Sequence, residues 1–170
     1  MITLQKPSEA QAALLTEIGR RTYLQTYGHL INPQSVAQHL DKTFQPEIQL
    51  AEINDPRRMI EIACLGTEAV GYLHLVEETP PPGIGKERTL KLQRIYVDTR
   101  WQGKKVGLML MNRCAEIGRE NNFKTLWLSV WKKNHRAQAF YKKHGFFAVG
   151  EELFTVGDIQ EQNDILLRTL

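Results

Sequence analysis

The first third of the chain carries apolar positions at helical spacing. Leu14 and Ile18 fall on one face of the segment that follows Pro7, with Thr22 beside them. The run Ser8-Glu9-Ala10-Gln11 matches a capping box, in which a serine and a later glutamine satisfy the free donors at a helix start. The pattern predicts a short strand at 2–5, a helix at about 8–26, a second helix from Asn32-Pro33, and one or two helical turns from Pro46 to Asn54.

Short runs of β-branched and apolar residues then replace the helical spacing. The runs 59–65 and 69–76 have Gly66-Thr67-Glu68 between them, which is typical of a hairpin. The proline-rich segment 79–85 that follows is expected to be a surface loop. Its fragment Gly83-x-Gly85-Lys86 lacks the spacing of a P-loop, so no phosphate role is expected for it.

The middle of the chain has the order and length of a strand–helix–strand crossover. Strand 90–97, a helix from Val106 to about Asn121 and strand 125–130 predict two parallel strands joined in the right-handed sense. The alternation in the first strand slips by one residue between Leu92 and Ile95, as it does at a β-bulge. The remaining expected elements are a helix at 137–144, capped by Asn134, and two strands containing 146–149 and 165–167, joined by a polar turn near Gly157-Asp158. Together these elements predict an α/β sandwich with a mixed sheet.

Composition fits one globular domain over residues 1–170. Hydrophobic residues make up 42% and charged residues 24%, which excludes disordered and collagen-like chains. The sequence has no apolar run of the roughly 20 residues that span a bilayer, and its first residues do not read as a secretory signal. Cys64 and Cys114 are expected to be buried, reduced thiols. A cytoplasmic protein without membrane contact is therefore expected.

A net charge of +3 conceals a strong segregation. Residues 79–150 hold 15 Lys and Arg against 4 Asp and Glu, whereas the two flanks hold 7 against 15. A basic central segment favours an anionic partner there, and acidic flanks allow a cationic partner elsewhere.

The basic loop between the middle strand and its helix has the features of an anion site. The sequence 100–107, RWQGKKVG, places Gly103 and Gly107 around Lys104 and Lys105 at a helix start. Unpaired backbone N–H groups and the helix dipole attract an anion there, and glycine allows close approach. The spacing of a dinucleotide motif is absent, so a diphosphate fits better.

This loop and its surroundings resemble the GNAT superfamily of N-acetyltransferases. The stretch from Gln102 to Gly107 matches the acetyl-CoA signature Q/R-x-x-G-x-G/A, although Lys105 stands where a glycine is usual. The segment LQRIYV before the loop belongs to the same family pattern. The stretch LWLSVWKKNHRAQAFYKKHGF, with VGDIQEQNDILL after it, looks like that of PaiA-type polyamine acetyltransferases in particular. The resemblance implies a mixed central sheet of about seven strands with a splayed parallel pair, flanked by about four helices.

The resemblance also implies roles for individual residues. The pantetheine arm of acetyl-CoA would lie between the splayed strands, against backbone groups of Ile95 and Val97, and an N–H near Ile95 or Tyr96 would polarise the thioester carbonyl. Tyr141 would be the general acid that protonates the CoA thiolate. The residues expected to bind acetyl-CoA are Ile95, Tyr96, Val97, Gln102, Gly103, Lys104, Lys105, Val106, Gly107, Asn134 and Lys143.

The general base and the acyl acceptor stay open at this stage. A polyamine such as spermidine or spermine is the acceptor that the resemblance favours, by direct transfer in a ternary complex. Base candidates are Glu77, Glu78, Glu87 and Asp98, each otherwise an ordinary exposed carboxylate, and candidates for holding an ammonium group are Glu17, Tyr23, Tyr27, Asp41 and Glu47.

Other functions fit the sequence less well. A protein or peptide N-acetyltransferase and a non-catalytic CoA-sensing module remain alternatives. A nucleic-acid-binding protein is disfavoured, because the helix at 106–121 mixes acidic and basic residues rather than presenting a basic face. The five histidines show neither metal-ligand spacing nor a nearby cysteine, so no metal is expected. A homodimer remains possible.

Overall fold

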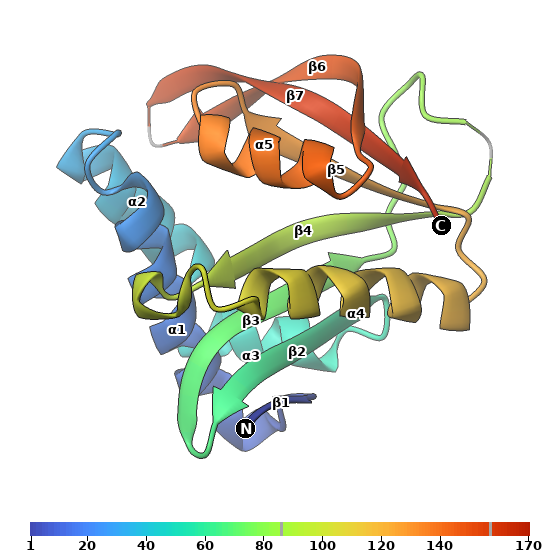
Figure 1. Ribbon diagram of the computed structural model, residues 1–170. Coiled ribbons are helices and arrows are strands. Elements are labelled where there is room, and N and C mark those ends of the chain that lie inside the picture. Colours follow the sequence, from blue (N-terminus) through green and yellow to red (C-terminus); the bar gives the residue numbers. More distant parts are fainter. Residues whose placement is uncertain (86, 157) are drawn as a thin grey trace.

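A seven-stranded sheet with the strand order β1-β2-β3-β4-β5-β7-β6 forms the centre of the computed structural model, which describes residues 1–85, 87–156 and 158–170 (Figure 1). The strands are β1 (Ile2–Gln5), β2 (Arg58–Leu65), β3 (Glu68–Val76), β4 (Thr89–Val97), β5 (Thr125–Trp131), β6 (Phe147–Val156) and β7 (Ile159–Thr169). The helices are α1 (Ala12–Tyr27), α2 (Pro33–Thr43), α3 (Pro46–Asn54), α4 (Val106–Glu120) and α5 (His135–Lys143), with short 3-10 turns η1 (Glu9–Gln11) and η2 (Thr99–Trp101). The expected mixed sheet is confirmed.

Local signals set most helix boundaries. The side chain of Asn32 accepts a hydrogen bond from the backbone N–H of Ser35 at 2.8 Å, with Pro33 in the first turn of α2. The capping box at Ser8 forms, but it opens the 3-10 turn η1, from which α1 continues. The segment after Pro46 extends to a nine-residue helix, so five helices rather than about four flank the sheet in the described part of the chain.

Two of the expectations touch residues outside the described part. Residues 79–85 form the expected loop without helix or strand, but Lys86, the last residue of the Gly83-x-Gly85-Lys86 fragment, lies outside the described residues. Gly157 also lies outside them, so the expected polar turn between β6 and β7 is described only for Asp158.

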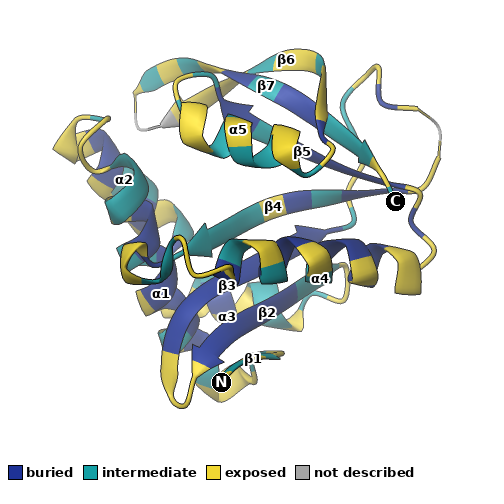
Figure 2. Cartoon of the chain, viewed as in Figure 1, coloured by how far each residue is buried: buried dark blue, intermediate teal, exposed yellow. Residues whose placement is uncertain are grey.

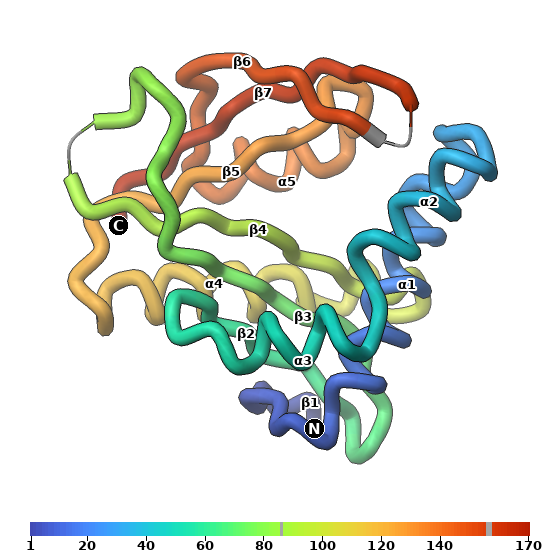
Figure 3. Tube along the Cα trace, turned by 180° about the vertical axis from the view of Figure 1, so that it is seen from behind, coloured from blue at the N-terminus to red at the C-terminus, as the bar shows by residue number. Residues whose placement is uncertain are grey.

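The sheet divides the core into two layers. Helices α4 and α5 cover one face, and α1, α2 and α3 lie on the other (Figures 1 and 3). Leu73, Leu110 and Leu126 belong to the first layer, while Ile18 and Ile62 belong to the second. Strands β2 and β3 are buried along most of their length (Figure 2). Among the described residues no helix is both long and apolar enough to cross a bilayer.

The parallel strands β4 and β5 pair only at one end. Their register covers Thr89 with Thr125, Leu90 with Leu126, and Lys91 with Trp127. Beyond these three pairs the strands part, while β5 keeps its pairing with β7 as far as Trp131. The expected splayed pair is therefore present, and it leaves two strand edges facing each other across a gap.

The predicted bulge lies in β4. The register with β3 shifts between the pair His74–Arg94 and the pair Leu75–Leu92, which leaves Gln93 as the extra residue. Because of this extra residue, Leu92 and Ile95 both pack in the core layer under α4 and α5.

Candidate active site

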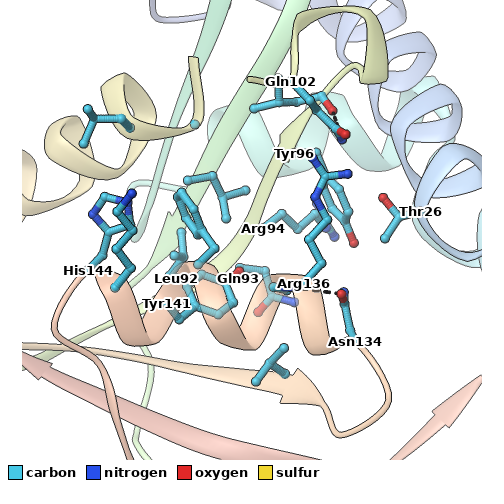
Figure 4. A pocket seen from close by; sticks show the side chains of 18 of the residues that line it. Thr26, Leu92, Gln93, Arg94, Tyr96, Gln102, Asn134, Arg136, Tyr141 and His144 are labelled. Atoms are coloured by element: carbon cyan, nitrogen blue, oxygen red, sulfur yellow. Dashed lines mark hydrogen bonds between the residues drawn. The ribbon is translucent and has the colours of Figure 1, made fainter. Parts of the chain in front are cut away.

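A cavity of about 570 Å³ lies where β4 and β5 part. Its walls are the second half of β4, the start of α4 and the inner side of α5. Figure 4 shows Asn134, Arg136 and Tyr141 on one side of it, with Tyr96 and Gln102 opposite. The sequence-predicted residues that line it are Ile95, Tyr96, Val97, Gln102, Gly103, Lys105, Gly107, Asn134, Tyr141 and Lys143.

Backbone donors at the start of α4 face this cavity region. Among the described residues, no hydrogen-bond acceptor is present for the N–H groups of residues 105–108, the first turn of the helix. The helix dipole adds about half a positive charge at the same end. Gly103 has a φ of 77°, which lets the preceding loop turn sharply into the helix. This arrangement can hold a pyrophosphate.

Lys105 adopts the backbone conformation that a glycine usually supplies. Its φ is 64° and its ψ is 7°, in the left-handed region. A non-glycine residue there costs roughly 1–2 kcal/mol because Cβ approaches the following carbonyl. The departure from the family signature is thus accommodated by backbone strain, and it places a positive charge in the lining of the cavity.

Only some of the basic residues near the larger cavity line it. Lys105, Lys143 and Arg136 line the cavity, and Arg136 is a residue that sequence reasoning did not single out. Lys104 instead stacks its ammonium over the Trp101 ring at 4.6 Å. Val106 is buried in the core with 2% of its surface exposed, so its contribution to the site is its backbone N–H.

The open edge of β4 is partly occupied by the protein itself. The side-chain amide of Gln102 donates to the carbonyl of Val97 at 3.2 Å. This carbonyl, one of the groups expected to face the pantetheine arm, therefore already accepts one hydrogen bond and keeps a second lone pair for a ligand. The main-chain groups of Ile95 and Tyr96 remain the candidates for pairing with ligand amides, and both residues line the cavity.

Tyr141 projects from α5 into the cavity. Its ring lies between Phe140 and Phe146, with centroids 5.6 Å from each. Burial, reinforced by the nearby Tyr27 and Cys114, raises the pKa of the Tyr141 hydroxyl above its ordinary value of 10.0. The hydroxyl therefore keeps its proton at neutral pH, as a general acid must.

Asn134 links α5 to α1. Its side-chain oxygen accepts from the backbone N–H of Ala137 at 3.1 Å, which confirms the expected N-cap. Its amide nitrogen points to the Tyr27 hydroxyl at 3.5 Å. Burial raises the pKa of Tyr27, although hydrogen bonds with Asn134 and Tyr96 oppose this effect.

A second cavity of about 350 Å³ adjoins the first, on the side of α1 and α2. Its walls are largely aromatic, and the Tyr23 and His39 rings stack with centroids 4.4 Å apart. Burial, followed by the charge of Arg94, lowers the pKa of His39 to about 4, so this imidazole is neutral at pH 7. The residues common to both cavities are Tyr27, Leu92, Gln93, Arg94, Tyr96 and Ser129.

Two acidic residues that the sequence did not single out line the second cavity. They are Glu152 on β6 and Glu161 on β7, in the acidic C-terminal flank. Of the candidates named for holding an ammonium group, Tyr23 and Tyr27 line this cavity. Glu17 pairs with Arg21, Asp41 pairs with Arg20, and Glu47 is exposed in the first turn of α3. Glu152 and Glu161 reach the site through the strand register between distant segments, rather than through a local sequence pattern.

The carboxylates proposed as general bases are engaged in ion pairs or lie at the surface. Asp98 is fully buried, not exposed as expected, because Arg21 and Arg100 pair with it at 2.9 Å. Hydrogen bonds from Arg100 are the main reason why the pKa of Asp98 falls to about 2, which makes it a poor base. Glu77 pairs with Arg88 and Glu78 with Lys91, while Glu87 is exposed.

Metal ligands and reactive thiols do not gather here. In the described ranges, no group of three or more His, Cys, Asp and Glu side chains is arranged to hold a metal ion. Cys64 and Cys114 are free and buried, as expected, and burial raises the pKa of both thiols.

The family model, the sequence relatives and the solved structures that resemble this chain are all acetyltransferases. The family model described as "Acetyltransferase (GNAT) family" matches residues 24–146. An uncharacterised N-acetyltransferase from the pepI 3′ region of Lactobacillus delbrueckii subsp. lactis is 31% identical, covering 98% of this chain and 96% of the relative.

Solved structures share the whole fold at lower identity. The PaiA N-acetyltransferase of Thermoplasma acidophilum, in complex with coenzyme A, has a TM-score of 0.82 at 19% identity, covering 100% of this chain and 99% of that one. The ribosomal-protein-S18-alanine N-acetyltransferase of Escherichia coli has a TM-score of 0.71 at 16% identity, covering 99% and 94%. The second name specifies a ribosomal-protein alanine as acceptor and the first specifies none, so the shared fold alone does not select an acceptor.

Proposed function

The chain belongs to the GNAT family of acetyltransferases and is an acetyl-CoA-dependent N-acetyltransferase, and from this we propose that its acceptor is a small primary amine, with a polyamine as the first choice. The single observation that carries the proposal is the junction of two cavities at Tyr27, Gln93 and Ser129. One cavity offers the donors that an acyl carrier needs, and the other offers aromatic faces and carboxylates. Two adjoining cavities can hold the two substrates at the same time, which supports direct transfer in a ternary complex.

Acetyl-CoA is assigned to the larger cavity. The N–H groups of residues 105–108 and the ammonium of Lys105 bind its pyrophosphate, with Lys143 and Arg136 at the opening. Main-chain groups of Ile95 and Tyr96 bind the pantetheine arm along the open edge of β4. An N–H donor at this position stabilises negative charge that develops on the carbonyl oxygen.

Tyr141 is assigned as the general acid. The nitrogen of a neutral amine attacks the thioester carbonyl, the new C–N bond replaces the C–S bond, and the amine nitrogen releases one proton to water. The leaving thiolate takes a proton from the Tyr141 hydroxyl, and the phenolate regains one from water. A positioned proton donor contributes roughly 10²–10⁴ in rate. Neither Cys64 nor Cys114 is available as a nucleophile, because both lie buried in the core.

The smaller cavity is assigned to the acceptor. Its aromatic rings come from Tyr23, Tyr27, His39, Phe44, Tyr96, Trp131 and Phe154. Aromatic faces attract alkylammonium groups by about 0.5–1 kcal/mol each when exposed, and more when desolvated. Glu152 and Glu161 add negative charge on the same side. A flexible alkyl chain with several amino groups can contact the aromatic rings and pair with the carboxylates of this cavity.

A thiol-release assay with acetyl-CoA tests this function. We expect release with diamines and polyamines, and weaker or no release with amino acids, aminoglycosides and short peptides. The Tyr141→Phe variant is the control for catalysis at this site. Release with peptides alone would overturn the choice of acceptor, and tight CoA binding with no product from any amine would overturn the proposed acceptor class altogether.

A further inference from the structure

Two hydrogen-bond acceptors lie side by side in the lining of the smaller cavity. Glu152 on β6 lies directly opposite Asn163 on β7 in the antiparallel ladder. Residues opposite each other in such a pair project to the same face, with Cβ atoms about 4.5–5.5 Å apart. Both residues line the cavity, so their side chains bound the same space.

Asn163 is buried with an unmet acceptor. Only 5% of its surface is exposed, and its amide nitrogen donates to the Ser129 hydroxyl at 2.9 Å. Its carbonyl oxygen has no hydrogen-bond partner in the part of the chain that the structure describes. An unsatisfied buried carbonyl costs about 1–3 kcal/mol, so a donor entering the cavity would gain that energy.

Glu152 is the carboxylate of this region that has no ion-pair partner among the described residues. Its strand neighbour Glu151 pairs with Lys132 on the other face of the sheet. Glu161, also in the cavity, is bound to Lys133 at 3.0 Å and to the indole N–H of Trp131 at 3.1 Å.

The cations of the cavity are already compensated. The ammonium of Lys91 lies 2.7 Å from Glu78. The guanidinium of Arg94 binds Glu52 through two hydrogen bonds of 2.8 and 3.0 Å. Neither cation is therefore available to neutralise Glu152, which leaves its charge for a ligand.

We infer that Glu152 and Asn163 bind a primary ammonium group of the acceptor, as a specificity-determining subsite. Two acceptors that have no donor partner among the described residues match the three N–H donors of –NH₃⁺. The Trp131 and Phe154 rings beside them favour the same charge. This inference rests on the proposed function and narrows it.

The bound ammonium is not the group that is acetylated. A carboxylate partner keeps an amine protonated, whereas the attacking nitrogen must be neutral. The attacking amine instead reaches the junction at Ser129, which is one hydrogen bond away from Asn163. The acceptor therefore carries at least two amino groups, one of which is recognised and another acetylated.

Kinetics with 1,4-diaminobutane and n-butylamine test the subsite in the full-length protein. For the Glu152→Gln variant we expect kcat/KM for the diamine to fall about ten- to a hundredfold, since a hydrogen bond to a charged group contributes about 1.5–3 kcal/mol. The value for n-butylamine stays the same. Glu151→Gln, on the same strand but the opposite face, leaves both values unchanged.

Asn163 variants supply the second measurement. Asn163→Asp keeps an acceptor and retains diamine activity, whereas Asn163→Leu loses it to an extent similar to Glu152→Gln. Equal losses for mono- and diamine in Glu152→Gln, or an unchanged diamine value, would overturn the subsite. Loss of diamine activity in Asn163→Asp with full activity in Asn163→Leu would do the same.

Calorimetric titration with 1,4-diaminobutane keeps the subsite testable if the unaltered protein acetylates no amine at all. Binding that Glu152→Gln abolishes and Glu151→Gln preserves would support the subsite while the proposed acceptor fails. Absence of diamine binding to the unaltered protein, with or without CoA, would overturn the subsite itself.

Discussion

The buried carboxylate of Asp98 lies 2.9 Å from the guanidinium of Arg21, and this ion pair joins helix α1 to the loop that enters α4. Arg100 binds the same carboxylate through its backbone N–H at 3.0 Å and its side chain at 3.1 and 2.9 Å. The loop that presents the backbone donors of the larger cavity is thus anchored from two sides.

Asp98 is expected to contribute to acid stability. Its pKa falls from 3.8 to about 2 on folding, so its contribution is complete above pH 3.8 and is lost as the pH falls toward 2. Asp98→Asn should lower the free energy of unfolding at pH 7 by about 2 kcal/mol and flatten its pH dependence in that window. Urea unfolding at a series of pH values measures both. Asp41→Asn, at an exposed pair with Arg20, serves as the control and should change little. An unaltered acid slope in Asp98→Asn would contradict the assignment.

Strain and charge at Lys105 can be separated by two substitutions. Lys105→Gly removes the strain of a φ of 64° and should raise stability by about 1 kcal/mol, whereas Lys105→Ala retains Cβ and should leave it nearly unchanged. Both variants lose the ammonium and should bind CoA more weakly, to a similar degree. Thermal melting measures the change in stability, and calorimetric titration measures the affinity for CoA. A glycine variant no more stable than the alanine variant would show that the left-handed conformation carries no cost.

Glu52 compensates a buried cluster of basic groups. Its carboxylate binds Arg94 and lies 3.6 Å from Arg58, with His74 beside them. Glu52→Gln leaves the buried Arg94 guanidinium without a counter-charge, whereas Arg58 keeps Asp55 at 3.2 Å, and the variant should lower the free energy of unfolding by about 3–5 kcal/mol. Glu17→Gln, at the exposed pair with Arg21, should change it by less than about 1 kcal/mol. Comparable urea midpoints for the two variants would refute this role.

Tyr141→Phe is expected to separate catalysis from binding. It removes the proton donor but keeps the ring against Phe140 and Phe146, so kcat should fall about tenfold or more while the dissociation constant for CoA is unchanged. Tyr72→Phe is the matched control, because the Tyr72 hydroxyl is buried and has no partner among the described residues. Its kcat should equal that of the unaltered protein. Full activity in Tyr141→Phe would remove this residue from the mechanism.

Local patterns in the sequence predicted the frame of the site. The slip between Leu92 and Ile95 located the bulge, which the structure places at Gln93. The basic loop before Val106 predicted the helix start with open N–H groups. These features depend on neighbours in the chain, which is why spacing and turn chemistry were sufficient.

Features that depend on distant segments could not be predicted in this way. Asp98 was expected to be exposed, because nothing near it in the sequence indicates that Arg21 of α1 covers it. Glu152 and Asn163 meet through the register of β6 with β7, and no local pattern fixes which residues of two strands stand opposite each other. The acidic flank signalled a cationic partner without selecting its residues.

The three-pair contact between β4 and β5 also bears on the stability of the enzyme with and without ligand. Beyond Lys91 the two strands are not hydrogen-bonded to each other, and a ligand whose amides bind both edges would replace the missing hydrogen bonds of the sheet. Such occupancy favours the native chain by RT ln(1 + [L]/Kd). The protein would then unfold less readily with its acyl carrier bound than without it, so that the same open edge that admits the ligand also makes stability depend on it.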